Sequence, residues 1–136
     1  GVQTCALPIL MEVIASRYAD KRSRTPMEML ADGMTHGAYV IGKPIADWRR
    51  FDFRKHPVSM SINGKVVQQT EGWKGKIDPP DGIVWLANHV MTRAVGGLKK
   101  GIAITTGALA GTTPAKPGDK VVGDWGAWGR VETTFR

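Results

Sequence analysis

The sequence has a single cysteine, Cys5, and no apolar run long enough to cross a membrane. One cysteine excludes an internal disulfide and a cysteine-based metal cluster. A membrane-spanning helix needs about 20 consecutive apolar residues, and the first residues also lack the basic start and long apolar region of a secretory signal. We therefore expect a cytoplasmic protein with no membrane partner.

Acidic residues are also scarce: 12 aspartates and glutamates stand against 19 lysines and arginines, which gives a formal net charge of +7. Such an excess is typical of nucleic-acid-binding proteins, and the basic run at 48–56 contains aromatic residues, as single-strand binders do. The basic runs, at 20–24 and 48–56, are nevertheless short and match no nucleic-acid-binding signature. Solvated surface is the simpler interpretation, so we predict no nucleic-acid partner; a small basic nucleic-acid-binding β-module is the alternative.

A chain of 136 residues with 42% hydrophobic side chains can bury one core, so we expect one domain. The fold class that the patterns predict is α+β: mixed, mostly antiparallel strands around that core, with a few short helices. Strands are expected at 10–15, 38–41, 102–104, 120–125 and 130–135, a β-hairpin over 57–70, and helices at 26–34 and 78–92.

Two local patterns give definite expectations about pairing and packing. Asn63-Gly64 predicts a two-residue hairpin turn, which would pair Met60 with Val67 and Ser61 with Val66. In the helix at 78–92, apolar residues recur at helical spacing, which predicts that this helix packs on the sheet. These residues are Ile83, Leu86, Ala87, Val90 and Met91.

Glu12 interrupts an apolar row on the first predicted strand, where a period of two places it on the face of Leu10 and Ile14. A carboxylate in such a row needs a cation or a hydrogen-bonding partner, or else it protonates. From the residues alone, a salt bridge with Arg17 is the favoured interpretation. A bound metal ion is the alternative.

The strand predicted at 102–104 ends in Thr105-Thr106-Gly107, a sequence suited to contacting a ligand. Hydroxyls can donate to a carboxylate or carbonyl without adding charge, and Gly107 would let a small anion approach the backbone closely. An ordinary strand end is the alternative. The sequence K-P-G-D at 116–119 then predicts a type II turn before the next strand.

Five motifs in order resemble the fumarylacetoacetate hydrolase superfamily, in its 2-keto-4-pentenoate hydratase branch. They are P-x-x-x-V-x-W-L-A-N on a helix, L-x-x-G, then T-T-G, P-x-x-P-G-D at a turn, and a closing D-[FW]-G-x-x-G-x-V-x-x-x-F. The resemblance runs from about Leu10 to the end of the chain, and it implies the rolled, mostly antiparallel fold of the fumarylacetoacetase C-terminal domain. The matching residues are Pro79, Trp85, Leu86, Ala87, Asn88, Leu98, Gly101, Thr105, Thr106, Gly107, Pro114, Pro117, Gly118, Asp119, Asp124, Gly126, Gly129, Val131 and Phe135.

The activity that this resemblance implies is that of a metal-dependent hydratase, a carbon–oxygen lyase acting on 2-hydroxypenta-2,4-dienoate-type acids in the meta-cleavage degradation of aromatic compounds. Mg²⁺ or Mn²⁺ would be the cofactor and a small 2-oxo or 2-hydroxydienoic acid the substrate. The full-length protein would be a homo-oligomer. Close relatives decarboxylate 4-oxalocrotonate, and more distant ones hydrolyse a C–C bond in acylpyruvates; the sequence does not choose among the three.

The resemblance makes Glu12 a metal ligand, because it matches the family's E-V-I-D-S-R segment, in which Ala15 here replaces the Asp. Relatives take two further ligands from an upstream Glu-x-Glu pair, and this sequence contains no such pair. Residues 1–9 resemble a translated sequencing adapter, which should pack loosely, so the domain is expected to be 10–136. We therefore expect that an upstream part is missing and that the chain alone is inactive.

The remaining site residues come from two stretches. Asp32, Thr35 and His36 lie in A-D-G-M-T-H-G, which is similar to the family's substrate-side stretch A-D-N-A-S-S-G. Thr106 and Gly107 complete the implied substrate contacts. As the catalytic candidate, His36 would donate to a substrate carboxylate or carry a proton; an exposed loop histidine is the alternative.

Overall fold

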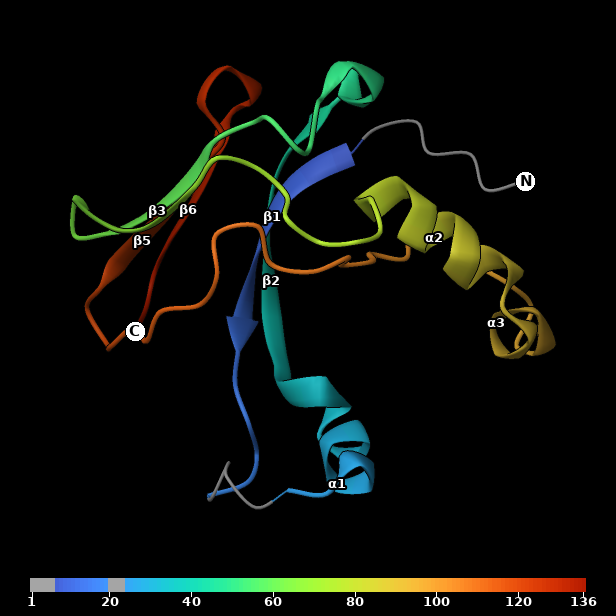
Figure 1. Cartoon of the computed structure of the whole chain (residues 1–136). Helices are drawn as coiled ribbons and strands as arrows, with labels where there is room; N and C mark the ends of the chain where they lie inside the picture. The colour runs from blue at the N-terminus through green and yellow to red at the C-terminus, as the bar shows by residue number, and fades with distance from the viewer. Residues whose placement is uncertain (1–6, 20–23) are drawn as a thin grey trace.

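The structure is a computed structural model that describes residues 7–19 and 24–136. Figure 1 shows strands and a few short helices, which confirms the predicted α+β class. The elements are β1 (Leu7–Ile14), α1 (Pro26–Ala31), β2 (His36–Ile45), β3 (Val58–Ile62), β4 (Lys65–Thr70), α2 (Pro79–Asn88), α3 (Val90–Ala94), β5 (Lys120–Asp124) and β6 (Arg130–Thr134). No helix in these described ranges is both long and apolar enough to cross a bilayer.

The strands form two antiparallel sheets. β1 pairs with β2, and the other four strands lie in the order β4-β3-β5-β6. In Figure 1 the β1–β2 pair runs through the centre of the molecule, with the four-stranded sheet on one side and α2 and α3 on the other. The central pair therefore separates these two helices from the larger sheet.

The core lies where β1 meets the four-stranded sheet. Its buried apolar side chains within the described residues are Ile9, Phe51, Val58, Val121 and Val131. Ile9 is only 6% exposed, and its Cδ1 lies 3.4 Å from the position that a Cβ at Gly129 would take, so β1 packs tightly on the turn before β6. β1 also begins at Leu7 rather than Leu10. Ile9 therefore does not pack loosely, whereas the domain start at Leu10 stays a prediction; residues 1–6, including Cys5, lie outside the described part of the chain.

The predicted hairpin is confirmed, with one difference in register. Asn63 (φ 51°) and Gly64 (φ 82°) both take positive φ, as a type I′ turn requires. Ser61 pairs with Val66 as predicted, but Met60 pairs with Gln68 because a bulge shifts the register between Met60 and Ser61. A β-bulge places one extra residue on one strand of a pair, which shifts the pairing beyond it by one position.

The predicted turn at 116–119 is also confirmed. The N–H of Asp119 donates to the carbonyl of Lys116 (3.0 Å), and Gly118 takes φ 91°, as the third position of a type II turn requires. Asn63 ties this turn to the hairpin, since its Nδ2 donates to Asp119 Oδ1 (2.8 Å) and its Oδ1 accepts from the Lys120 N–H (2.9 Å). The two turns therefore close the same end of the four-stranded sheet.

Two element predictions are wrong, and a third is right in type but differs in its bounds. The strand expected at 102–104 does not form, and Ile102 is 52% exposed. The helix expected over 78–92 is broken at His89, whose extended backbone (ψ 138°) separates α2 from α3 while its Nδ1 accepts from the Met91 N–H. The strand expected at 38–41 is longer and runs through to Ile45.

The apolar stripe of α2 and α3 does not pack on the sheet as predicted. Of its five members, Val90 and Met91 are more than half exposed, and Ile83, Leu86 and Ala87 are half-buried. The spacing of a stripe shows that one face is apolar, but it does not show which element covers that face. The helix expected over 26–34 is shorter too, ending at Ala31, although its Thr25–Glu28 capping box is present as predicted.

Candidate active site

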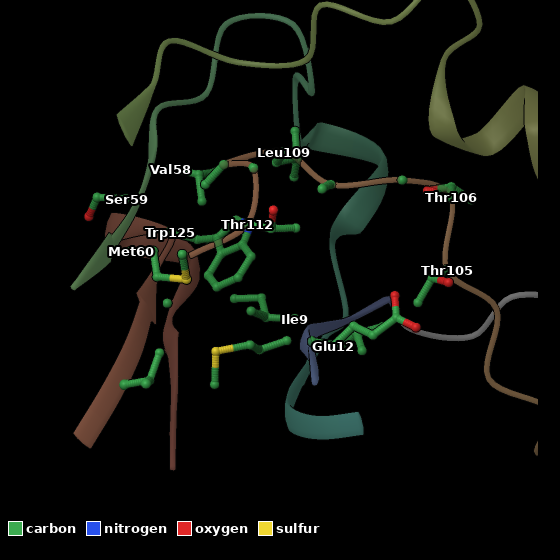
Figure 2. Close-up of a pocket in the computed structure, with 18 of the residues that line it drawn as sticks. Ile9, Glu12, Val58, Ser59, Met60, Thr105, Thr106, Leu109, Thr112 and Trp125 are labelled. Carbon is green, nitrogen blue, oxygen red and sulfur yellow. The ribbon is translucent and has the colours of Figure 1, made fainter. Parts of the chain in front are cut away.

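A cavity of about 500 Å³ lies between β1, the segment 104–115 and the inner face of the four-stranded sheet. Figure 2 shows that its two ends differ: Glu12, Thr105 and Thr106 lie at one end, and an apolar group that includes Val58 and Met60 lines the other. Ligand sites combine an apolar wall with a few polar groups in this way. The structure therefore places Glu12 and the two threonines, which are 93 and 94 residues away in the sequence, around one cavity.

Glu12 reaches the cavity from the middle of β1. Its carboxylate points toward Thr105 in Figure 2, and its Oε1 lies 2.9 Å from His36 Nδ1. The predicted salt bridge between Glu12 and Arg17 is wrong, because the Arg17 guanidinium contacts Asp32 instead, with Nη1 at 3.4 Å from Oδ1. About one third of the Glu12 side chain is exposed, so water reaches the carboxylate.

His36 and Tyr39, both on β2, lie between the Glu12 carboxylate and the Thr105 hydroxyl and contact one group each. Their ring centroids are 4.1 Å apart, and the Tyr39 hydroxyl lies 3.4 Å from Thr105 Oγ1. Tyr39 is also the direct cross-strand partner of Glu12. Sequence reasoning missed Tyr39 because only the pairing of β1 with β2 brings it next to the predicted site.

Asp32 does not line the cavity, although it was predicted beside the substrate. Its fully buried carboxylate accepts from Ser16 Oγ (2.8 Å), the Arg17 N–H (2.9 Å) and Arg24 Nη1 (2.9 Å). The Arg17 backbone N–H, with the Ser16 hydroxyl and the Arg17 side chain, holds the pKa of Asp32 below its usual value. These contacts show that Asp32 fastens the chain that follows β1 to the end of α1.

Thr35 also lies outside the cavity lining. Its carbonyl accepts from the Ala15 N–H (2.8 Å), and its hydroxyl donates to the Met34 carbonyl. The first contact ties the turn between α1 and β2 to the residue after β1, and the second lies within the turn, so the structure gives Thr35 a part in holding this turn. As substrate contacts, Asp32 and Thr35 remain predictions that this geometry does not favour.

Asp32 should make stability depend on pH. A carboxyl group whose pKa is lower in the folded state stabilises the fold above its unfolded pKa of about 4, and this contribution is lost as pH falls through the folded pKa. We therefore expect the fall in melting temperature below about pH 4 to be shallower in Asp32→Asn than in the parent, and the variant to be less stable at pH 7. Thermal unfolding followed by circular dichroism at several pH values measures both; parallel curves would contradict this role.

Gly107 lies against the indole ring of Trp73, where the sequence predicted room for a small anion. A Cβ at Gly107 would lie 2.8 Å from Cη2 of Trp73, and the ring is held because its Nε1 donates to the Ile77 carbonyl (2.8 Å). Trp73 thus fastens the segment 104–107, which has no strand partner in the described residues. Thr106, one residue earlier, lines both the main cavity and a second hollow that faces α2.

Substitution of Gly107 by alanine should therefore be more costly than the same change at Gly111. Both glycines have positive φ (122° and 76°), but a Cβ at Gly111 would meet only Gln68, at 3.6 Å. A φ of 122° also lies farther from the left-handed α region than 76° does, so the difference combines extra backbone strain at position 107 with the collision with Trp73. We expect Gly107→Ala to lower the free energy of unfolding by about 1–3 kcal/mol more than Gly111→Ala, the range for overpacking. Urea denaturation measures both; equal values would place Trp73 elsewhere in solution.

The described residues fit only part of a site for a hard divalent cation. Glu12 is the single carboxylate among the cavity-lining residues, and the described chain holds no group of three His, Cys, Asp or Glu side chains able to bind a metal. Mg²⁺ favours six oxygen ligands, usually one or two of them protein carboxylates. Glu12 with the Thr105 and Thr106 hydroxyls is an oxygen set of the right kind, but it does not make a complete site.

Relatives at the sequence level are lyases. The chain is 30% identical over 125 residues to 2-keto-4-pentenoate hydratase of Paraburkholderia xenovorans (strain LB400), covering 92% of this chain and 46% of that protein. It is 28% identical over 125 residues to 4-oxalocrotonate decarboxylase of Pseudomonas putida, covering 92% and 47%. The chain therefore spans about half the length of the curated relatives it matches.

Solved structures give the same result at the level of the fold. The 4-oxalocrotonate decarboxylase from Pseudomonas putida G7, complexed with magnesium and adipate, superposes with a TM-score of 0.79 at 27% identity, covering 95% of this chain and 48% of that one. The family model described as fumarylacetoacetate (FAA) hydrolase C-terminal matches residues 8–136. Because the sequence matches over residues 8–136 and the fold agrees over 95% of the chain, the chain belongs to the fumarylacetoacetate hydrolase C-terminal family.

Proposed function

We propose that this chain supplies the substrate-binding part of a divalent-cation-dependent lyase that acts on a small 2-oxo or 2-hydroxydienoic acid. The observation that carries the proposal is the meeting of Glu12 with Thr105 and Thr106 at the polar end of one cavity. Relatives of the same family that act on such acids support it, as does a relative solved with magnesium. Mg²⁺ or Mn²⁺ is the proposed cation.

In this proposal, the polar end of the cavity binds the cation and the acid group, and the other end holds the rest of the substrate. Glu12 gives a negatively charged oxygen that suits a hard cation, and the hydroxyls of Thr105 and Thr106 suit donation to the oxygens of the acid. When bound, the cation would polarise the 2-oxo group. The apolar end, around Val58 and Met60, would hold the rest of the acid away from water.

The hydratase reaction is favoured over decarboxylation of a dicarboxylic acid. Among the described residues, no Lys, Arg or His side chain lines the main cavity, and its end remote from Glu12 is lined by apolar side chains and the uncharged hydroxyls of Ser59 and Thr112. A second carboxylate there would lose its hydration without gaining a cation, which is costly. An acid with an uncharged tail avoids that cost. Decarboxylation of 4-oxalocrotonate is the second candidate, because relatives with that activity match over the same length.

The test uses this chain preceded by the upstream half of the Paraburkholderia xenovorans hydratase, hereafter the extended protein, alongside the chain alone. Both are incubated with 2-hydroxypenta-2,4-dienoate or 4-oxalocrotonate and Mg²⁺ or Mn²⁺, and products are followed by NMR. We expect the extended protein to form a 4-hydroxy-2-oxo acid, EDTA to stop it, and the chain alone to be inactive. Release of CO₂ from 4-oxalocrotonate as the faster reaction would favour the second candidate. No turnover of either acid, with salt-sensitive oligonucleotide binding, would favour a nucleic-acid module.

A further inference from the structure

Strand pairing alone does not fix the two polar groups of the cavity, the Glu12 carboxylate and the Thr105 hydroxyl. Glu12 has a long side chain that is one third exposed, and its described polar contact is the one to His36. Thr105 lies in a segment with no strand pairing in the described residues, so its hydroxyl depends on side-chain contacts for its place. Within the described residues, the Thr105 hydroxyl contacts the Tyr39 hydroxyl, at 3.4 Å.

We propose that His36 and Tyr39 are positioning residues that together fix this polar end. His36 holds the Glu12 carboxylate through Nδ1, Tyr39 holds the Thr105 hydroxyl, and the contact between the two rings makes them one unit on β2. Oε1 of Glu12 faces His36, which leaves the second carboxylate oxygen for the cavity. The proposal rests on the proposed function in so far as that function assigns Glu12 and Thr105 to the substrate.

The backbone before His36 supports this assignment. Three consecutive residues, Gly33, Met34 and Thr35, take left-handed φ values of 59°, 56° and 66°. This region is unfavourable for a side chain such as Met and more so for the β-branched Thr. Strain of this kind persists only where the surroundings impose it, and it is concentrated at functional sites.

Contacts at both ends of this turn impose its shape. Before it, the buried Asp32 carboxylate is fixed by donors from Ser16, Arg17 and Arg24. Within it, the Thr35 carbonyl accepts from the Ala15 N–H, next to the end of β1. The result is that β2 starts with His36 opposite Ile14, within reach of Glu12 two residues away. Asp32 and Thr35, which were predicted to contact the substrate, would thus affect the site indirectly, by fixing the position of His36 at the start of β2.

The test compares three variants of the extended protein. His36→Phe keeps a ring but removes the Nδ1 contact, whereas His36→Asn retains a nitrogen close to that position. Tyr39→Phe removes only the hydroxyl. Binding of Mn²⁺ to each is measured by relaxation of water protons, with folding checked by ¹H–¹⁵N spectra, and the Tyr39–Thr105 contact is followed by nuclear Overhauser effects.

We expect His36→Phe to weaken Mn²⁺ binding about 10- to 100-fold, as loss of a group that orients a ligand does, and His36→Asn to restore part of it. Tyr39→Phe should lose the Overhauser contacts to Thr105 and, in the extended protein, raise KM roughly 2- to 10-fold with kcat little changed. Unchanged Mn²⁺ binding in a folded His36→Phe, or persistent Thr105 contacts in Tyr39→Phe, would overturn the proposal. If His36→Phe does not fold, Mn²⁺ binding to His36→Asn and the Thr105 contacts in Tyr39→Phe test the proposal. These readouts do not require turnover, so failure of the proposed reaction would remain distinguishable.

Discussion

Replacement of Glu12 by glutamine should lower kcat/KM of the extended protein by about 10²- to 10³-fold, the range for loss of one preorganised electrostatic contact at the reacting centre. Glutamine has the same shape but no negative charge, so it attracts a cation far less and gives His36 a weaker acceptor. Glu12 is the single carboxylate among the described residues that line the cavity. No neighbouring side chain of the described lining can therefore replace its charge.

Glu132→Gln is the matched control for this experiment. Glu132 lies on β6, outside the cavity lining, and pairs with Lys120 at 3.1 Å where both side chains are about half exposed. Exposed ion pairs of this kind contribute little to stability. The kcat/KM of Glu132→Gln should therefore stay within about two-fold of the parent value. Steady-state kinetics with Mn²⁺ gives both values. If Glu12→Gln retains parental kcat/KM, the cavity described above is not the reacting site.

Replacement of Ile9 by alanine should lower the free energy of unfolding by about 2–5 kcal/mol, the range for a buried isoleucine truncated in a packed core. Ile9 is 6% exposed and lies against the turn before β6. The deletion of residues 1–9 should cost at least as much. This reverses the expectation from the sequence, by which the same deletion would leave stability almost unchanged.

Ile102→Ala is the control, because it makes the same change at a side chain that is 52% exposed. Substitutions at such sites usually alter stability by less than about 0.5 kcal/mol. Urea denaturation of the three variants and the parent gives the comparison. Equal, small effects of Ile9→Ala and Ile102→Ala would show that β1 does not pack on the sheet in solution and that the domain does start near Leu10.

The parts of the fold that the sequence predicted correctly are those set by residues near one another in the chain. The Asn63-Gly64 turn, the turn at 116–119 and the Thr25–Glu28 capping box each follow from backbone preferences of a few residues. All three are present. The T-T-G motif likewise marked a cavity wall correctly, although the strand expected before it does not form.

The parts that failed depend on contacts between distant residues. Arg17 is five positions from Glu12, but the carboxylate pairs with His36, 24 positions away, because β1 and β2 are neighbours. The apolar stripe of α2 and α3 gave no information about what covers it. Tyr39 carries no local signal at all, since its importance comes from a cross-strand position and a contact to Thr105, 66 residues away.

The central claim is that Glu12 and the 105–107 segment form one cation- and acid-binding site, and paramagnetic broadening by Mn²⁺ tests it most directly. Mn²⁺ is added in small amounts to the ¹⁵N-labelled extended protein, with and without a monocarboxylic 2-oxo acid such as 2-oxopentanoate, and amide signals are compared in the parent and in Glu12→Gln. We expect the amides of Glu12, His36, Thr105 and Thr106 to broaden first, more strongly with the 2-oxo acid, and Glu12→Gln to remove the effect. Broadening centred on an exposed acid such as Asp81, unchanged by Glu12→Gln, would contradict it.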